Sequence, residues 1–160
     1  MRIGINGFGR IGRAVFRLIS KLHDINVVVI NDLNTDIKNV CYTLKYDSIH
    51  GRFRQSVQSK KNEIIVDEKK IKYFSKPKID QVNWQKFGVN LVVDSSGILE
   101  NVKIINKNSK LSEYTIVTHA TYKQKNIKTI VFGANDETVN IKKYNNFSSS
   151  ICDTVAFLPI

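Results

Sequence analysis

The feature that most constrains the fold of this chain is the glycine-rich run GFGRIG at residues 7–12, which lies directly between two apolar segments. The segment before it, residues 2–6, has the short apolar pattern of a strand, and residues 13–22 after it place apolar side chains at helical spacing. Residues 25–32 then form a continuous apolar run, typical of a parallel strand buried on both faces. Strand, tight turn, helix and strand in this order predict a βαβ unit.

The remaining sequence continues the alternation of helices and strands. Helical spacing predicts two further helices, and short apolar runs predict further strands. The helices are expected at 36–46 and 100–111, short strands joined by polar turns at 51–58, 62–67 and 69–74, and buried strands at 90–97, 114–120 and 128–135. This pattern predicts an α/β fold with a Rossmann-type, doubly wound, mainly parallel sheet and a small inserted antiparallel meander.

Composition is that of an ordinary globular protein. Hydrophobic residues make up 42% and charged residues 24% of the chain, which argues against a disordered or fibrous protein. No apolar run approaches the roughly 20 residues that a membrane helix needs, and the first residues lack the pattern of a secretory signal. We therefore expect no membrane partner and a cytoplasmic location. The two cysteines and three histidines form no ligand cluster, so no metal site is expected.

The net charge of +11 raises the question of a nucleic-acid partner. The lysines are scattered from Lys21 to Lys143 with only isolated pairs, and they form no basic stripe with interleaved aromatic residues. A lysine-rich surface accounts for such a distribution. We therefore expect no specific nucleic-acid partner.

The glycine run becomes informative through its surroundings, because the same spacing alone is a weak signal. Gly7 permits the tight turn, Gly9 lets a pyrophosphate approach the backbone, and Gly12 lets the helix pack on the strand. Asp32 stands 20 residues after Gly12 at the end of the next strand, where a carboxylate accepts hydrogen bonds from an adenosine ribose and repels a 2′-phosphate. This arrangement predicts NAD as the cofactor rather than NADP. The alternative is that the glycines serve only a tight turn.

Cys152 is the candidate nucleophile. A polar loop leads through it into an apolar stretch, and a cysteine at a helix N-terminus has its thiolate stabilised by the helix dipole. Judged without a family, a lone cysteine is more often a small buried hydrophobe, and no partner base stands near it in sequence. Cys41 lies on an apolar helical face and is expected in the core. His119 follows a predicted strand at the edge where ligands bind in α/β sheets.

Five segments together resemble the glyceraldehyde-3-phosphate dehydrogenase family, and the resemblance runs over essentially all 160 residues. They are INGFGRIGR at 5–13, the pair Asn31-Asp32, LKYDSIHGRF at 44–53, DSSG at 94–97 and the serine-rich loop that contains Cys152.

Details within the family favour its erythrose-4-phosphate dehydrogenase branch. The KYDSIHGRF segment and Trp84 are similar to that branch, as is the pair Thr118-His119, where the branch has Ser-His and the glycolytic enzymes usually have Ser-Ala. Ordinary glyceraldehyde-3-phosphate dehydrogenase is the alternative.

The resemblance implies an NAD-dependent oxidoreductase that acts on a phosphorylated aldehyde. For the favoured branch the reaction converts erythrose 4-phosphate to 4-phosphoerythronate, which serves pyridoxal phosphate biosynthesis. Cys152 attacks the aldehyde, hydride passes to NAD, and water or phosphate releases the acyl group. A homotetramer is also implied. The matching cofactor-binding positions are Gly7, Gly9, Arg10, Ile11, Gly12, Asn31, Asp32, Ser95, Gly97 and Thr118, and Thr154 matches a substrate-binding position.

Two stretches depart from the family pattern. The active-site loop normally reads Ser-Asn-Ala-Ser-Cys-Thr-Thr-Asn, whereas residues 148–155 read SSSICDTV. Ile151 thus replaces a serine that helps to grip the substrate, and Asp153 places a carboxylate beside the nucleophile, which disfavours the thiolate. Pro77 and Lys78 stand where an Arg-Asp pair usually flanks the adenine.

The resemblance also implies a domain division. Residues 1–150 match the NAD-binding Rossmann domain, and residues 151–160 match the start of the active-site helix of a catalytic domain that is otherwise absent. That domain supplies the histidine base and the substrate-phosphate contacts in the family. We therefore expect a truncated half-enzyme with little or no turnover alone. A stand-alone nucleotide-binding or interaction module is the alternative from another class.

Overall fold

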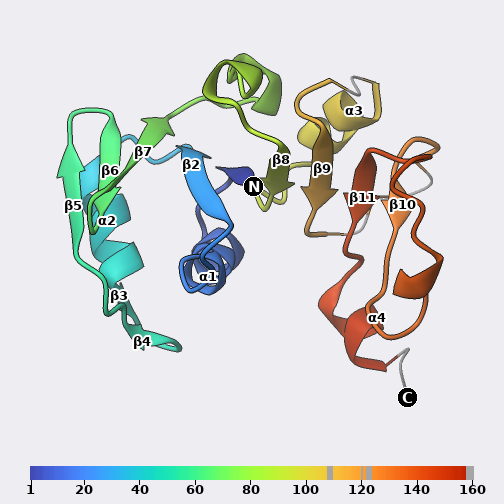
Figure 1. Cartoon of the computed structure of the whole chain (residues 1–160), viewed down its shortest axis with the longest axis horizontal. Helices are drawn as coiled ribbons and strands as arrows, with labels where there is room; N and C mark the ends of the chain where they lie inside the picture. Colours follow the sequence, from blue (N-terminus) through green and yellow to red (C-terminus); the bar gives the residue numbers. More distant parts are fainter. Residues whose placement is uncertain (108–109, 120, 122–123, 158–160) are drawn as a thin grey trace.

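The computed structural model describes residues 1–107, 110–119, 121 and 124–157. Within them the main feature is a nine-stranded sheet with strand order β10-β11-β9-β8-β1-β2-β7-β6-β5. In Figure 1 the strands cross the view in that order, from β5 at the left to β10 at the right. The first strand lies inside the sheet with later strands on both sides, which confirms the predicted Rossmann-type, doubly wound architecture.

The strands from β10 to β7 pair in parallel. Their bounds are Arg2–Asn6 for β1, Asn26–Asn31 for β2, Lys69–Phe74 for β7, Leu91–Asp94 for β8, Tyr114–Val117 for β9, Lys128–Thr129 for β10 and Asn146–Ser148 for β11.

The predicted meander is present as the antiparallel strands β5 (Val57–Lys60), β6 (Glu63–Val66) and β7. It is continuous with the main sheet, because β7 also pairs in parallel with β2. A separate two-stranded antiparallel sheet is formed by β3 (Tyr46–Asp47) and β4 (Gly51–Arg52).

Four α-helices accompany the sheet in the described residues. They are α1 (Arg10–Ile19), α2 (Ile37–Lys45), α3 (Leu99–Lys107) and α4 (Cys152–Phe157), and the 3-10 helices are η1 (Ile79–Gln81), η2 (Gln85–Phe87) and η3 (Asp136–Thr138). Asp36 caps α2, since its carboxylate accepts the backbone N–H groups of Lys38 and Asn39.

The C-terminal part of the sheet differs from the prediction. A buried strand was expected over 128–135, but β10 covers only two residues and the chain then turns. The sequence pattern does not predict the strand β11, because two of its three residues, Asn146 and Ser148, are polar. This short strand is nevertheless fully buried, since it lies between β9 and β10. Part of the predicted helix 100–111 and residue 120 lie outside the described residues.

Two apolar layers pack against the central part of the sheet around β2 and β8. One layer joins Phe16 of α1 and Leu44 of α2 to Ile5 of β1. The other contains Trp84 and Ile105 of α3, and the Trp84 side chain is fully buried with its Nε1–H donating to the carbonyl of Ile79. Cys41 is buried in the first layer, as the sequence predicted.

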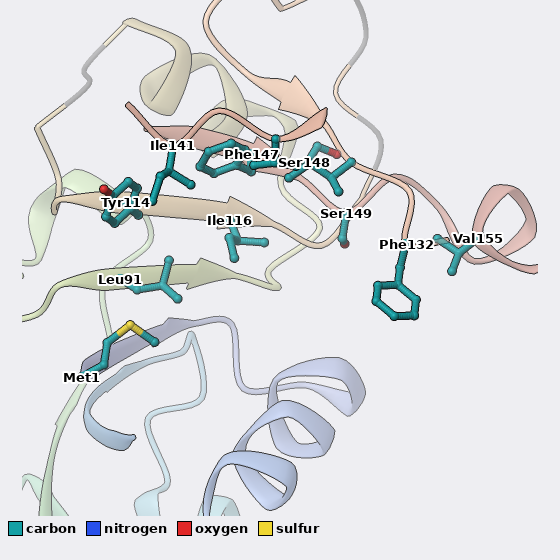
Figure 2. A pocket seen from close by; sticks show the side chains of 12 residues that line it. Met1, Leu91, Tyr114, Ile116, Phe132, Ile141, Phe147, Ser148, Ser149 and Val155 are labelled. Carbon is teal, nitrogen blue, oxygen red and sulfur yellow. The ribbon is translucent and has the colours of Figure 1, made fainter. Parts of the chain in front are cut away.

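An apolar groove of about 470 Å³ lies over the half of the sheet formed by β8, β9 and β11. Figure 2 shows Tyr114 and Ile141 toward one end of it and Phe132 with Val155 toward the other. Phe132 is 78% exposed and Ile141 57% exposed, so this surface is open in the described part of the chain. We call this surface the apolar groove; it is lined by Met1, Leu91, Tyr114, Ile116, Ile130, Phe132, Val139, Ile141, Phe147, Ser148, Ser149 and Val155.

None of the helices in the described ranges combines the length and the apolar character needed to cross a membrane.

Candidate functional site

The glycine-rich turn between β1 and α1 is very tightly packed at two of its glycines. Gly7 has a φ of +86°, and a Cβ built on it would lie 2.5 Å from the backbone nitrogen of Ser96. A Cβ on Gly12 would lie 2.1 Å from the carbonyl oxygen of Gly7. Only glycine fits at either position, because backbone atoms occupy the space that a side chain would need. The roles predicted for Gly7 and Gly12 therefore have a direct steric basis.

Gly9 differs, because a Cβ built on it would meet nothing within 4 Å. It precedes α1 and offers no side chain that could cap the helix. The first N–H groups of a helix have no intrahelical partner and carry a partial positive charge. The open space above Gly9 therefore adjoins a helix N-terminus, beginning at Arg10 and Ile11, that can receive a phosphate group.

Asp32 follows β2 and holds the glycine turn directly. Its Oδ2 accepts the backbone N–H of Phe8 at 2.5 Å, and its Oδ1 accepts the backbone N–H of Asn34 at 2.9 Å. Each carboxylate oxygen can accept more than one hydrogen bond, so capacity remains for a ribose hydroxyl. The structure thus places a half-buried carboxylate beside the turn, as the spacing predicted.

Ser95 follows β8 and also contacts the turn. Its Oγ–H donates to the carbonyl oxygen of Gly7 at 2.6 Å, and its backbone N–H donates to the carbonyl of Asn6 at 2.7 Å. Gly97 has a φ of +71° and open space around it. Thr118 follows β9, and its backbone N–H donates to the carbonyl of Asp94.

These elements enclose a cleft of about 280 Å³ at the carboxyl ends of β1, β2 and β8. Of the predicted cofactor-binding residues, the cleft brings together Gly7, Gly9, Asn31, Asp32 and Ser95. Arg10, Ile11, Gly12 and Gly97 do not line it but lie close in sequence to residues that do, whereas Thr118 follows β9, which contributes no residue to its lining. We call it the cofactor cleft; it is lined by Asn6, Gly7, Gly9, Asn31, Asp32, Leu33, Lys76, Pro77, Ser95, Ser96, Ile98 and Asn101.

The sequence reasoning missed a cluster of buried polar residues at the cofactor cleft, of which Asn6 and Asn101 line it. Asn6, Asp94 and Asn101 are almost completely buried, and each takes part in side-chain hydrogen bonds. Burial raises the pKa of the Asp94 carboxyl, although hydrogen bonds from Ser96 and Asn6 oppose the shift. The only available signal in the sequence was that two adjacent buried strands, β1 and β8, each end in a polar residue, Asn6 and Asp94.

Cys152 begins α4, which follows β11 at the lower right of Figure 1. Its side chain is exposed, and its Sγ lies 3.7 Å from Oδ1 of the neighbouring Asp153. Thr154 is half-buried in the same helix. The thiol does not line the cofactor cleft. In the described part of the chain, no group of three or more His, Cys, Asp and Glu side chains could hold a metal ion.

A glycine turn against a helix N-terminus, with a carboxylate at the end of the next strand, defines a dinucleotide-binding domain. Comparison with family models matches residues 1–102 to the NAD-binding domain of glyceraldehyde 3-phosphate dehydrogenase. This chain belongs to the glyceraldehyde 3-phosphate dehydrogenase family, whose NAD-binding domain it contains.

Individual relatives agree with this assignment. The glyceraldehyde-3-phosphate dehydrogenase of Thermotoga maritima is 38% identical over 161 residues, which is 99% of this chain and 47% of the relative. The Mycoplasma pneumoniae enzyme is 34% identical over 160 residues, and glyceraldehyde-3-phosphate dehydrogenase 1 of Bacillus cereus is 37% identical over 158 residues. These matches cover 100% and 99% of this chain and 47% of each relative. The chain therefore spans about half the length of the relatives it matches.

Proposed function

We propose that this chain binds NAD in the cofactor cleft and serves as the cofactor-binding half of a phosphorylated-aldehyde dehydrogenase. The single observation that carries the proposal is the open space over Gly9, which adjoins a helix N-terminus. At the other two glycines of the motif, Gly7 and Gly12, backbone atoms fill the corresponding space. The space over Gly9 suits a pyrophosphate. The proposal assigns Arg10 and Ile11 backbone contacts to the pyrophosphate, Asp32 and Asn31 the ribose side, and Ser95, Gly97 and Thr118 the nicotinamide side.

Asp32 carries the preference between the two nicotinamide cofactors. Its oxygens already hold the N–H groups of Phe8 and Asn34, so the carboxylate is fixed in place before any ligand arrives. A fixed anion accepts the hydroxyls of an adenosine ribose and repels a 2′-phosphate.

In the proposed reaction Cys152 supplies the nucleophile. Its thiolate adds to the aldehyde carbon, and after oxidation the resulting thioester is cleaved by water or phosphate. NAD, when bound, supplies the hydride acceptor. The exposed thiol lies 3.7 Å from Oδ1 of Asp153 and does not line the cofactor cleft in which we place NAD. We therefore propose that this chain has no useful turnover by itself.

Chemical-shift mapping by NMR tests the placement of the cofactor. Titration of the isotopically labelled chain with NAD should shift the backbone amides of Gly9, Ile11 and Asp32 and leave those of the distant strand β5 unchanged. Shifts centred on another part of the chain, or no shifts at millimolar NAD, would refute the proposed site.

The identity of the phosphorylated aldehyde is a separate proposal. The names of the relatives favour glyceraldehyde 3-phosphate, whereas the Thr118-His119 pair supports erythrose 4-phosphate, which we propose as the substrate. Trp84 does not bear on this choice, because its side chain is fully buried in the core.

Protection of Cys152 from iodoacetamide compares the binding of the two aldehydes, since an aldehyde bound to the thiol blocks alkylation. Erythrose 4-phosphate should protect at the lower concentration, and equal or reversed protection would contradict the choice.

The tetramer that the family forms is a further proposal for the complete enzyme. The 160-residue chain corresponds to about half of the relatives, each matched over 47% of its length. We propose that the 160-residue chain on its own is monomeric. Light scattering measures the mass in solution, and a stable tetramer of this chain would contradict the proposal.

A further inference from the structure

Two hydrogen-bond relays start from one short segment, residues 76–79, and end on a single oxygen atom. The first relay begins at the backbone N–H of Lys76, which donates to Oδ1 of Asn31 at 2.8 Å. The Nδ2 group of Asn31 donates to Oδ1 of Asn6 at 2.7 Å. The Nδ2 group of Asn6 then donates to Oδ1 of Asp94 at 2.8 Å. Asn31 also donates to the carbonyl oxygen of Lys76, so it holds both polar groups of that peptide.

The second relay begins three residues further along, at the backbone N–H of Ile79. This group donates to Oδ1 of Asn101 at 3.1 Å, and Nδ2 of Asn101 donates to the hydroxyl of Ser96 at 3.0 Å. The hydroxyl of Ser96 donates to Oδ1 of Asp94 at 2.7 Å. Both relays therefore converge on the same carboxylate oxygen, and every donor in them points toward it.

Sheet register explains why the first relay forms. Asn6 is the register neighbour of Asn31 on β2 and of Asp94 on β8, so three polar side chains stand side by side at the carboxyl ends of three strands. All three are at most 2% exposed. A buried side-chain amide that loses a hydrogen-bond partner leaves a polar group unsatisfied. Because the carboxylate of Asp94 can only accept, Asn6 must turn its Nδ2 group toward Asp94 and its Oδ1 toward Asn31, and this in turn fixes the orientation of the Asn31 amide.

The segment held by the relays forms a wall of the cofactor cleft. Lys76 and Pro77 line the cleft together with Ser96 and Ile98. The other oxygen of Asp94, Oδ2, is buried and has no hydrogen-bond partner in the described part of the chain. The relays thus use one oxygen as an acceptor and make no use of a second.

We propose that Asp94 is a positioning residue that holds segment 76–79 in place as the wall of the cofactor cleft. It acts through Asn6 with Asn31 and through Ser96 with Asn101, and it supplies an acceptor at Oδ1 rather than a negative charge. The functional meaning of this wall rests on the proposed NAD site.

Amide hydrogen exchange of the ligand-free chain, followed by NMR, tests the proposal residue by residue. In Asp94→Ala the amides of Lys76 and Ile79 should both exchange at least about fivefold faster, since each relay loses its final acceptor. In Asp94→Asn both rates should stay within about twofold of the unmodified chain, because the amide oxygen replaces Oδ1. The amide of Asp32, which donates to the carbonyl of Phe74 outside the relays, is the internal control.

Two further variants separate the relays and keep the test decisive if Asp94→Ala does not fold. Asn6→Ala should accelerate the Lys76 amide and leave the Ile79 amide unchanged, and Ser96→Ala should do the reverse. Equal acceleration of both amides in each single variant would indicate general loosening and overturn the proposal. So would Asp94→Asn rates as fast as those of Asp94→Ala, since the charge would then be required.

A cofactor measurement separates this proposal from the proposed function. NAD affinity should fall at least about fivefold in Asp94→Ala and recover in Asp94→Asn. If the exchange pattern appears but no variant binds NAD, the positioning role stands and the proposed function fails. If NAD binds but the exchange pattern is missing, the proposed function stands and the positioning role of Asp94 fails.

Discussion

The backbone of Gly12 packs directly on the carbonyl oxygen of Gly7, so closely that a Cβ on Gly12 would stand 2.1 Å from that oxygen. The oxygen is also held by the Ser95 hydroxyl at 2.6 Å, so it has little freedom to move away. Helix α1 and the strands β1 and β8 are thus locked together at the turn, and the position of the helix N-terminus depends on this contact.

Alanine substitutions at two motif glycines should separate folding from binding. Gly12→Ala should lower the free energy of unfolding by about 1–3 kcal/mol, because backbone atoms must shift to admit the methyl group. Gly9→Ala should change stability by less than about 0.5 kcal/mol, since its Cβ would meet open space. Gly9→Ala should still weaken NAD binding about tenfold, or about 1.4 kcal/mol. Urea unfolding and calorimetry measure the two effects, and a stable, NAD-binding Gly12→Ala chain would contradict the packing argument.

The stability of the chain should depend on pH through Asp94. Burial raises the pKa of this carboxyl above 3.8, so the folded chain holds the proton more tightly than the unfolded chain. The stabilisation is complete below the ordinary value and is lost as pH rises through the raised value. The Asp94→Asn chain has no such titrating group, so its free energy of unfolding lacks this loss. The free energy of unfolding of Asp94→Asn minus that of the unmodified chain should therefore increase between about pH 4 and pH 7. His119, whose charge opposes the shift, should be kept in both proteins. A difference that does not change with pH would contradict the prediction.

Replacing the neighbour of the exposed cysteine should change its reactivity. Asp153→Asn removes a carboxylate whose Oδ1 lies 3.7 Å from Sγ of Cys152, so the attacking sulfur no longer has a negative charge beside it. Alkylation by iodoacetamide at neutral pH should accelerate a few-fold, as mass spectrometry can follow. Cys41 provides the control in the same chain, since burial raises the pKa of its thiol to about 11 and it should stay unmodified. Unchanged alkylation of Cys152 would show that Asp153 has no such influence.

The apolar groove should bind hydrophobic dyes. Phe132 and Ile141 are both mostly exposed on it, and contiguous exposed apolar surface attracts such probes. Phe132→Ser with Ile141→Asn should reduce the fluorescence of bound anilinonaphthalene sulfonate without lowering stability. Leu99→Ser is a matched control, because Leu99 is 60% exposed but does not line the groove. Equal loss of fluorescence in the control would mean that the dye does not report on the groove.

The parts of the molecule that the sequence predicted are those governed by local backbone rules. The turn at Gly7, the helix that starts at Arg10 and the strand ending at Asn31 follow from short-range spacing and steric limits. Strand β11 could not be predicted from the sequence, because burial between neighbouring strands, rather than an apolar pattern, stabilises Asn146–Ser148. The partnership of Asn6 with Asp94 spans 88 residues of sequence and depends on register, which no local pattern encodes.

Isothermal titration of the chain with NAD and with NADP tests the central claim most directly. The account predicts weak but measurable binding of NAD and still weaker binding of NADP, because Asp32 faces the cofactor cleft with a fixed carboxylate. Gly9→Ala should abolish most of the NAD signal in the same experiment. Equal or tighter binding of NADP would remove Asp32 from its assigned role, and the absence of NAD binding at millimolar concentration would contradict the account as a whole.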